Sequence, residues 1–412
     1  MFNMSTNTSL LHRTLVFGAL VLAALPASAA VTWKNIQLGG FASQGYLINT
    51  GHNDYLGDTS EGTFDFREYA VNASWSKGKF RAGGQAFAQK LGEYGEDKVS
   101  LDWGIVDYQA TQWFGLRAGR VKMPRGLYNE ALDVDSVRPF VLLPQSVYDA
   151  RLRGFNAAFN GAMVYGNVSL RNLGSVDYKL FYGDIPMSTS SGANDYFNND
   201  APFPNASIGM DAVYGGSLFW NTPVSGLRAG YSYSAFQDFG ADRIVSFVIP
   251  GVPPMEFIMY RATDLYERHL LSAEYTTGDW IFATEIGRET AFFGIGFPAT
   301  APIGFFDIEN LYGYLSVARR LNSRVEVGAY YSYSKEKQLS VGIENGQIFP
   351  DAIQHDFAVS AKFDITDHLI AKLEGHYLDG AGKLFDTATK PQPFARRDDS
   401  WFMLAAKVTY SF

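Results

Sequence analysis

The chain has 412 residues and an acidic balance, with 34 Lys and Arg against 42 Asp and Glu and a formal net charge of −8. This balance gives no electrostatic reason to bind nucleic acid, so we expect no nucleic-acid partner. The chain has no cysteine, which excludes disulfides and thiolate metal sites. Aromatic residues make up 15% and charged residues only 18%, and the 41 glycines add to a composition typical of many β-strands and tight turns.

The first 29 residues have the order of a secretory signal peptide. His12 and Arg13 precede an apolar run over residues 15–25, and Ala27 to Ala29 supply a cleavage site of small residues. The apolar run is too short for a membrane-spanning helix, which needs about 20 residues. We therefore expect residues 1–29 to be a signal peptide and residues 30–412 to be the mature chain.

Side-chain polarity alternates with period two along much of the mature chain, as expected for strands with one apolar face. Within 368–377, for example, Leu369, Ala371 and Leu373 share one face, and Lys372 and Glu374 share the other. Placing all such segments predicts sixteen strands, at 36–48, 64–76, 79–91, 99–111, 115–122, 161–170, 174–183, 211–221, 226–237, 263–276, 279–290, 310–321, 324–337, 353–365, 368–379 and 400–412.

The connections between these strands alternate strictly between short and long. The long ones are 49–63, 92–98, 123–160, 184–210, 238–262, 291–309, 338–352 and 380–399. In a closed up-and-down barrel every second connection lies on the same rim, and outer-membrane barrels have short turns on one rim and long loops on the other. The pattern predicts an all-β fold: a transmembrane, antiparallel up-and-down β-barrel of 16 strands.

Other features distinguish a barrel from a soluble β-sandwich or propeller, the alternative folds. A propeller would show a repeat of about 40–50 residues, which this sequence lacks. Aromatic residues near strand ends, including Trp75, Trp220, Trp280 and Trp401, are expected to form the interfacial girdles of a membrane barrel. The last strand ends at Phe412, and we expect it to pair with the first strand and close the cylinder.

These features together resemble the Gram-negative general and substrate-selective porins. The resemblance rests on the strand count, the terminal VTYSF that ends at Phe412, and the long loop that follows LRAGRVKMPRGLYNE (116–130). That run, with RPFVLLPQSVYD (138–149), is similar to a group of proteobacterial porin-like proteins loosely related to the phosphate-selective porins. The resemblance implies an outer-membrane homotrimer through which small hydrophilic solutes diffuse, with no cofactor.

The third long loop, 123–160, is the expected constriction of such a channel, folded into the lumen. Opposite charges across a narrow aqueous passage select permeants by sign and size. The candidate residues for pore constriction and permeant contact are Arg120, Lys122, Arg125, Glu130, Asp133, Asp135, Arg138, Arg151 and Arg153. The alternative, which the sequence leaves open, is that these charges form ion pairs that fix the loop to the wall.

Charges on the expected lumen face of the wall are mixed in sign. They include Arg81, Lys179, Arg228, Lys362, Lys372 and Lys407, and also Asp177, Glu274, Glu285, Glu326, Asp364 and Glu374. A strongly anion-selective pore would have a row of one sign, so we do not expect phosphate specificity. The basic residues around the third loop permit a mild preference for anions.

The functional alternative is an outer-membrane hydrolase or a surface receptor that uses the long loops. No nucleophile motif and no H-E-x-x-H motif occurs in a matching context, so we expect no catalytic residues. The segment 51–65 is rich in oxygen ligands but lacks the spacing of an EF-hand, and we interpret it as a solvated loop without a metal.

Overall fold

The computed structural model describes residues 31–33, 35–198, 205–247, 251, 255–340, 353–384 and 398–412, so the predicted signal peptide lies outside it. One antiparallel sheet holds all 18 strands of this part. Two of them, β1 (Val31–Trp33) and β9 (Asn205–Gly209), are short additions beside β2 and β11, which leaves the sixteen strands of the barrel wall.

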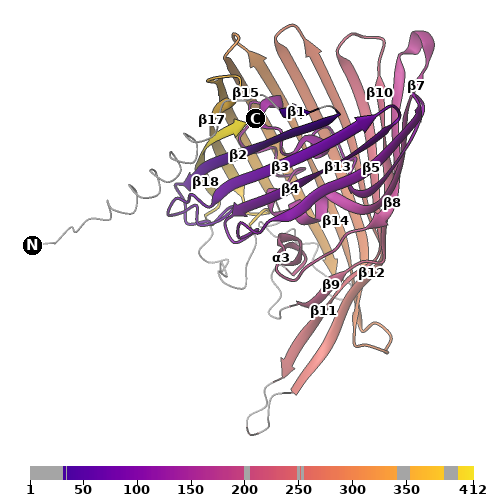
Figure 1. The fold of residues 1–412 in the computed structure, drawn as a ribbon. Coiled ribbons are helices and arrows are strands. Elements are labelled where there is room, and N and C mark those ends of the chain that lie inside the picture. Colours follow the sequence, from indigo (N-terminus) through magenta and orange to yellow (C-terminus); the bar gives the residue numbers. More distant parts are fainter. Residues whose placement is uncertain are drawn as a thin grey trace, which may run out of the picture.

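The barrel strands follow one another around the wall, each paired with its neighbours in sequence (Figure 1). They are β2 (Ile36–Asn49), β3 (Phe66–Lys77), β4 (Phe80–Leu91), β5 (Ser100–Thr111), β6 (Phe114–Lys122), β7 (Ala158–Ser169), β8 (Ser175–Asp184), β10 (Ala212–Asn221), β11 (Leu227–Phe247), β12 (Met255–Thr277), β13 (Trp280–Gly296), β14 (Gly304–Arg320), β15 (Val325–Ser340), β16 (Ile353–Asp364), β17 (Leu369–Gly380) and β18 (Ser400–Ser411). The predicted 16-stranded antiparallel barrel is confirmed.

The last strand closes the cylinder against the first. The β18–β2 register runs from Met403 opposite Asn49 to Ser411 opposite Phe41. Beyond it, the Phe412 N–H donates to the Gly40 carbonyl and the Gly40 N–H donates to the Phe412 carbonyl, both at 3.0 Å. The final residue therefore belongs to the closing seam, which leaves no unpaired edge there.

Four strands extend well beyond their predicted ends. The segments 238–262 and 291–309 were expected to be loops, and this expectation is wrong: β11 and β12 pair as far as Phe247 and Met255, and β13 and β14 reach Gly296 and Gly304. The β11–β12 hairpin projects past the other connections (Figure 1). Its β-branched and aromatic residues favour a strand, which accounts for the unusually apolar character of this segment.

The outer face of the barrel is apolar and the inner face is polar. Outward-facing Leu271, Ile286 and Val359 are 61%, 59% and 65% exposed, whereas their inward neighbours Ser272 and Glu285 are buried. Water does not favour a continuous exposed apolar band, but hydrocarbon does. No helix in the described part of the chain has the length and apolar character that crossing a bilayer requires.

The aromatic girdle includes most, but not all, of the predicted tryptophans. Trp75, Trp220 and Trp280 are 39%, 43% and 38% exposed on the outer face. Trp401 is only 2% exposed and was wrongly predicted to lie in the girdle. It packs inside the barrel against Tyr55, with ring centroids 6.5 Å apart.

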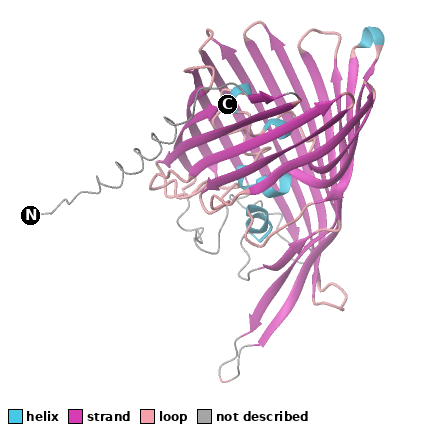
Figure 2. Ribbon diagram, in the orientation of Figure 1, coloured by secondary structure: helices cyan, strands magenta, loops and turns pink. Residues whose placement is uncertain are grey.

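The loop between β6 and β7 lies inside the barrel, as predicted, although it ends at residue 157 because β7 begins at Ala158. Its chain forms the short helices η1 (Asn129–Ala131), η2 (Asp135–Val137), η3 (Ala150–Leu152) and α2 (Arg153–Asn156). Elsewhere η4 (Arg171–Leu173) forms a turn and α3 (Gly192–Asn198) lies in the next long connection. Strands make up the wall and the helices belong to its connections (Figure 2).

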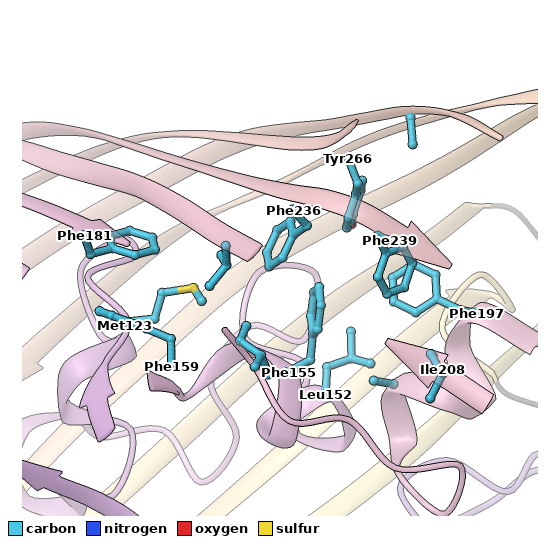
Figure 3. Packing of buried hydrophobic residues seen from close by; sticks show 14 of the residues in the cluster. Met123, Leu152, Phe155, Phe159, Phe181, Phe197, Ile208, Phe236, Phe239 and Tyr266 are labelled. Carbon is cyan, nitrogen blue, oxygen red and sulfur yellow. The ribbon is translucent and has the colours of Figure 1, made fainter. Parts of the chain in front are cut away.

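Apolar side chains fill the space between this loop and three parts of the wall. Phe155 stacks on Phe236 of β11 at 4.7 Å and meets Phe197 of α3 at 5.8 Å (Figure 3). Val141 and Leu142 pack in a second cluster, which includes Trp401 of β18. In a third cluster, loop residues pack against β12, β13 and β14; the cluster contains Leu143, Val147, Tyr148, Leu270, Ala283, Tyr312 and Tyr314. Because β18 lies several strands away from β11–β14 around the barrel, the loop crosses its interior.

Candidate functional site

The loop is fixed to the β13 wall by one fully buried carboxylate. Glu285 Oε1 accepts the Leu127 N–H at 3.0 Å, and its Oε2 accepts the Tyr148 hydroxyl. Two wall hydroxyls, Ser272 at 2.6 Å and Tyr314 at 3.0 Å, also donate to it. A buried carboxylate is tolerated only when hydrogen bonds replace its hydration, and here the loop supplies two of the four donors.

A second carboxylate holds the loop at the β17 wall. Glu374 accepts the backbone N–H groups of Val141 and Leu142, each at 2.9 Å. His376 Nε2 lies 2.9 Å from Glu374, and its Nδ1 lies 2.9 Å from Asp356. The wall therefore satisfies two loop donors that would otherwise be buried without a partner.

A loop carboxylate, Asp135, lies in a cluster of wall lysines. Its oxygens are 3.2 Å from Lys372 Nζ and 2.9 Å from Lys407 Nζ, and Thr409 donates at 2.5 Å. Arg138 lies 3.7 Å away. Burial opposes ionisation of Asp135, but Lys407 and Lys372 outweigh it and hold the pKa of the carboxyl well below its ordinary value.

A second loop carboxylate, Asp133, is held by β4, β5 and β6, on the far side of β2 and β3 from Lys372 and Lys407. It lies 2.8 Å from Lys122 Nζ and 2.6 Å from Arg153 Nη1, and Gln85 donates to it at 3.0 Å. Arg153 also reaches Asp102 of β5 at 2.6 Å. Burial would raise the pKa of Asp133, but Arg153 and Lys122 lower it below its ordinary value.

The other predicted residues are also engaged. Arg125 donates to the Val147 carbonyl at 2.6 Å and Arg120 to the Asp102 carbonyl at 3.1 Å. Arg151 pairs with Asp149 at 2.8 Å, and exposed Glu130 pairs with Lys179 of β8. Seven of the nine predicted residues thus form ion pairs, namely Lys122, Glu130, Asp133, Asp135, Arg138, Arg151 and Arg153.

A cavity of about 70 Å³ lies between the loop and the wall made by β3, β4 and β18. Its charged lining includes Arg138 and Arg153 from the loop and Glu68 and Lys407 from the wall. Near the short-turn rim a wider cavity of about 400 Å³ is lined by residues that include Val137. The described interior is therefore narrow beside the loop and wide on the short-turn side.

The sequence indicated the facing direction of most of these side chains but not their partners. Glu68 and Asp102 were missed, although the period-two pattern places Glu68 with the buried face of β3. Asp102 was harder to place because a register shift between Gln85 and Ala86 breaks the alternation beside it. Within the described segments, no group of three or more His, Asp or Glu side chains is arranged to hold a metal ion.

No family model and no curated protein matches this chain in sequence. Solved structures do match it. OmpT of Vibrio cholerae aligns over 93% of this chain and 100% of its own, at 9% identity and a TM-score of 0.53. The anion-selective porin from Comamonas acidovorans aligns over 92% and 99%, at 13% identity and 0.53. The channel DcaP of Acinetobacter baumannii aligns over 93% and 100%, at 9% identity and 0.54. Together with the closed sheet and the loop inside it, these matches show that the chain has the sixteen-stranded outer-membrane porin fold.

Proposed function

We propose that this protein is a passive channel of the bacterial outer membrane for small hydrophilic solutes. The observation that carries the proposal is a closed barrel, apolar outside, whose interior is crossed by a loop bearing paired charges. Hydrocarbon accepts a β-sheet only when every backbone group is paired, as in this closed wall. A barrel of this strand number leaves an aqueous interior unless something folded fills it.

The proposed permeation path passes between the loop and the wall of β3, β4 and β18. There four of the nine predicted residues act in two ways. Arg138 and Arg153 line the narrow cavity, and Asp133 and Asp135 hold them and the nearby lysines in place. The bound carboxylates make the constriction rigid, because any shift of the loop would separate buried charges.

A mild preference for anions follows from the cavity lining. Lys90, Arg138, Arg153 and Lys407 contribute four positive charges, against the two negative charges of Glu68 and Asp149. The similar Comamonas structure is an anion-selective porin, but at 13% identity it supports the fold rather than the selectivity. Assembly as a homotrimer remains a proposal that rests on the family resemblance.

Single-channel recording of the purified, detergent-extracted protein in a planar bilayer tests this function. We expect discrete ohmic conductance steps. Under a salt gradient, we expect a small reversal potential whose sign indicates anion selectivity. Strong cation selectivity would refute the anion preference but would leave the channel function standing. A correctly folded protein that gives no conductance would refute the channel and favour a surface receptor or hydrolase.

A further inference from the structure

A further cavity lies between the loop that joins β6 to β7, the helix α3 and the wall made by β12 to β15. Its volume is about 20 Å³, and Asp149 and Asn156 line both this cavity and the narrow one beside β3, β4 and β18. Glu289, which lines it on β13, lies four residues beyond the loop anchor Glu285 toward the long-loop rim, roughly 13 Å along the strand. The cavity therefore adjoins the proposed permeation path on its long-loop side.

One side chain of this cavity, Lys383, is buried without an anionic partner. It belongs to the turn that follows β17, where its backbone N–H donates to Gln354 Oε1 at 3.0 Å. The residue is only 7% exposed, and in the described part of the chain no carboxylate oxygen lies within 4 Å of its Nζ. The ammonium instead lies over the ring of Tyr196 on α3, 5.5 Å from the ring centroid. A buried ammonium is costly unless an anion or hydrogen-bond acceptors compensate it.

The acidic residues of the cavity are bound to other cations. The charged lining residues are Asp149, Arg268, Glu289, Lys335 and Lys383. Asp149 accepts from Arg151 at 3.0 and 2.8 Å, and Glu289 accepts from Arg268 at 2.8 Å. Each carboxylate therefore has its own guanidinium, and the lysines give the cavity an excess of positive charge.

Arg125 adds positive charge directly behind the cavity lining. Its guanidinium donates to the Val147 carbonyl at 2.6 Å and to the Tyr312 hydroxyl at 3.2 Å, and both of these residues line the cavity. Among the residues that the structure describes, Arg125 also has no carboxylate within 4 Å. Two buried cations without a carboxylate of their own thus create a positive potential in the cavity, which attracts a mobile anion.

The helix α3 holds Tyr196 in place beside Lys383. Asn310 of β14 donates to the Tyr196 hydroxyl at 2.9 Å. At the start of α3, a Cβ atom on Gly192 would lie 2.2 Å from the Arg151 carbonyl, so the backbone of the helix touches the backbone of the loop. The ring against which the ammonium rests is therefore fixed to both the wall and the loop.

The size of the cavity favours a carboxylate over a larger anion. One water-sized group needs a cavity of about 10–15 Å³. A volume of about 20 Å³ therefore suits the two oxygens of a planar carboxylate better than the four oxygens of a tetrahedral phosphate.

We propose that this cavity binds the carboxylate of a small organic acid, with Lys383 as the principal ligand. The ammonium donates a charge-assisted hydrogen bond to a carboxylate oxygen, and the Tyr196 ring holds the ammonium through a cation–π contact. The remainder of the solute lies in the adjoining narrow cavity. This inference rests on the proposed channel for the route by which the solute arrives, and it adds a chemical class of solute to the mild preference for anions.

The test compares acetate with acetamide, which has the same shape without the charge, and with inorganic phosphate. Binding to the purified mature protein in detergent is measured by the shift in melting temperature at constant ionic strength. Block of the single-channel chloride current gives a second measurement. Lys383→Met removes the charge and keeps a long side chain, and Lys383→Arg restores the charge. The control is Arg320→Gln, which removes a 40% exposed guanidinium from the wide cavity on the short-turn side.

We expect acetate to bind wild type, Lys383→Arg and Arg320→Gln with similar affinity and Lys383→Met at least about tenfold more weakly. Acetamide should bind none of the four proteins. Acetate binding that is retained in Lys383→Met, or equally lost in Arg320→Gln, would overturn the proposal. Acetamide or phosphate binding to wild type as tightly as acetate would also overturn it, and this comparison holds even if Lys383→Met does not fold. The two proposals fail separately: a wild type that conducts without binding acetate loses only this site, and one that binds acetate without conducting refutes only the channel.

Discussion

Replacing Glu374 by alanine tests the claim that wall carboxylates hold the loop inside the barrel. The Glu374 side chain is 0% exposed and accepts two loop N–H groups, from Val141 and Leu142, at 2.9 Å each. Both donors are buried, so the small alanine side chain leaves them without an acceptor. His376 also loses one of its two carboxylate neighbours.

The expected cost follows from the two orphaned donors. Each buried donor left without a partner costs about 1–3 kcal/mol, so Glu374→Ala should destabilise the attached loop by about 2–6 kcal/mol. Glu374→Gln retains one carbonyl acceptor and should lose about half as much. A matched control is Asp364→Ala on β16, because Asp364 is 23% exposed, pairs with Arg320 at 2.6 Å and lies on the wall. An ion pair of that kind is worth only about 0–1 kcal/mol.

Two measurements are needed, because the loop can detach while the barrel stays closed. Urea unfolding in detergent micelles gives the free energy of unfolding. Single-channel recording detects a detached loop, because such a loop changes the conductance and adds noise to the current. We expect Glu374→Ala to lower the unfolding midpoint and give larger, noisier steps, with Asp364→Ala close to wild type. If Glu374→Ala matches the control in both measurements, the anchoring role is wrong.

Three further predictions concern selectivity, closure and pH. Glu68→Gln removes the acidic wall charge from the narrow cavity, so the reversal potential should move toward anion selectivity; a move toward cations contradicts the proposed path. Deleting Phe412 removes its two backbone hydrogen bonds with Gly40 and should lower the yield of folded, heat-modifiable barrel on gels. An unchanged yield would contradict the role of Phe412 in closing the barrel. The pKa of Asp135 is depressed in the folded state, so its stabilising contribution is fully present above the ordinary Asp value of about 4 and is lost only as pH falls through the lower folded value. Any change in conductance between about pH 7 and pH 4 should therefore be the same in wild type and in Asp135→Asn, and a step that only the wild type shows would contradict this assignment.

The architecture could be predicted from the sequence because the polarity of each barrel strand depends on its local surroundings. One face of a strand contacts hydrocarbon and the other contacts water, so apolar and polar residues such as Leu373 and Glu374 alternate along it. This alternation alone shows which residues face outward and which face inward. The strictly alternating loop lengths then place the two rims. The projecting hairpin was missed because it extends past the apolar band, where Ile244 and Phe257 no longer follow the pattern used to end a strand.

The interior could be predicted only in part, because its partners are far apart in sequence. The charged residues of the loop were identified, yet the pairing of Asp135 with Lys372 and Lys407 joins segments more than 200 residues apart. Trp401 illustrates the same limit. A tryptophan at a strand end usually belongs to the girdle, and only the cluster with Tyr55 and Val141 shows that it faces inward.

Single-channel recording of wild type beside a variant lacking residues 130–145 is the most direct test that this loop narrows a water-filled barrel. These residues carry Asp133, Asp135 and Arg138 and the apolar run at 140–143, which together cross the lumen. The variant should fold, close through β18 and β2, and conduct in markedly larger steps than wild type. Identical conductance from a correctly folded variant would contradict the central claim.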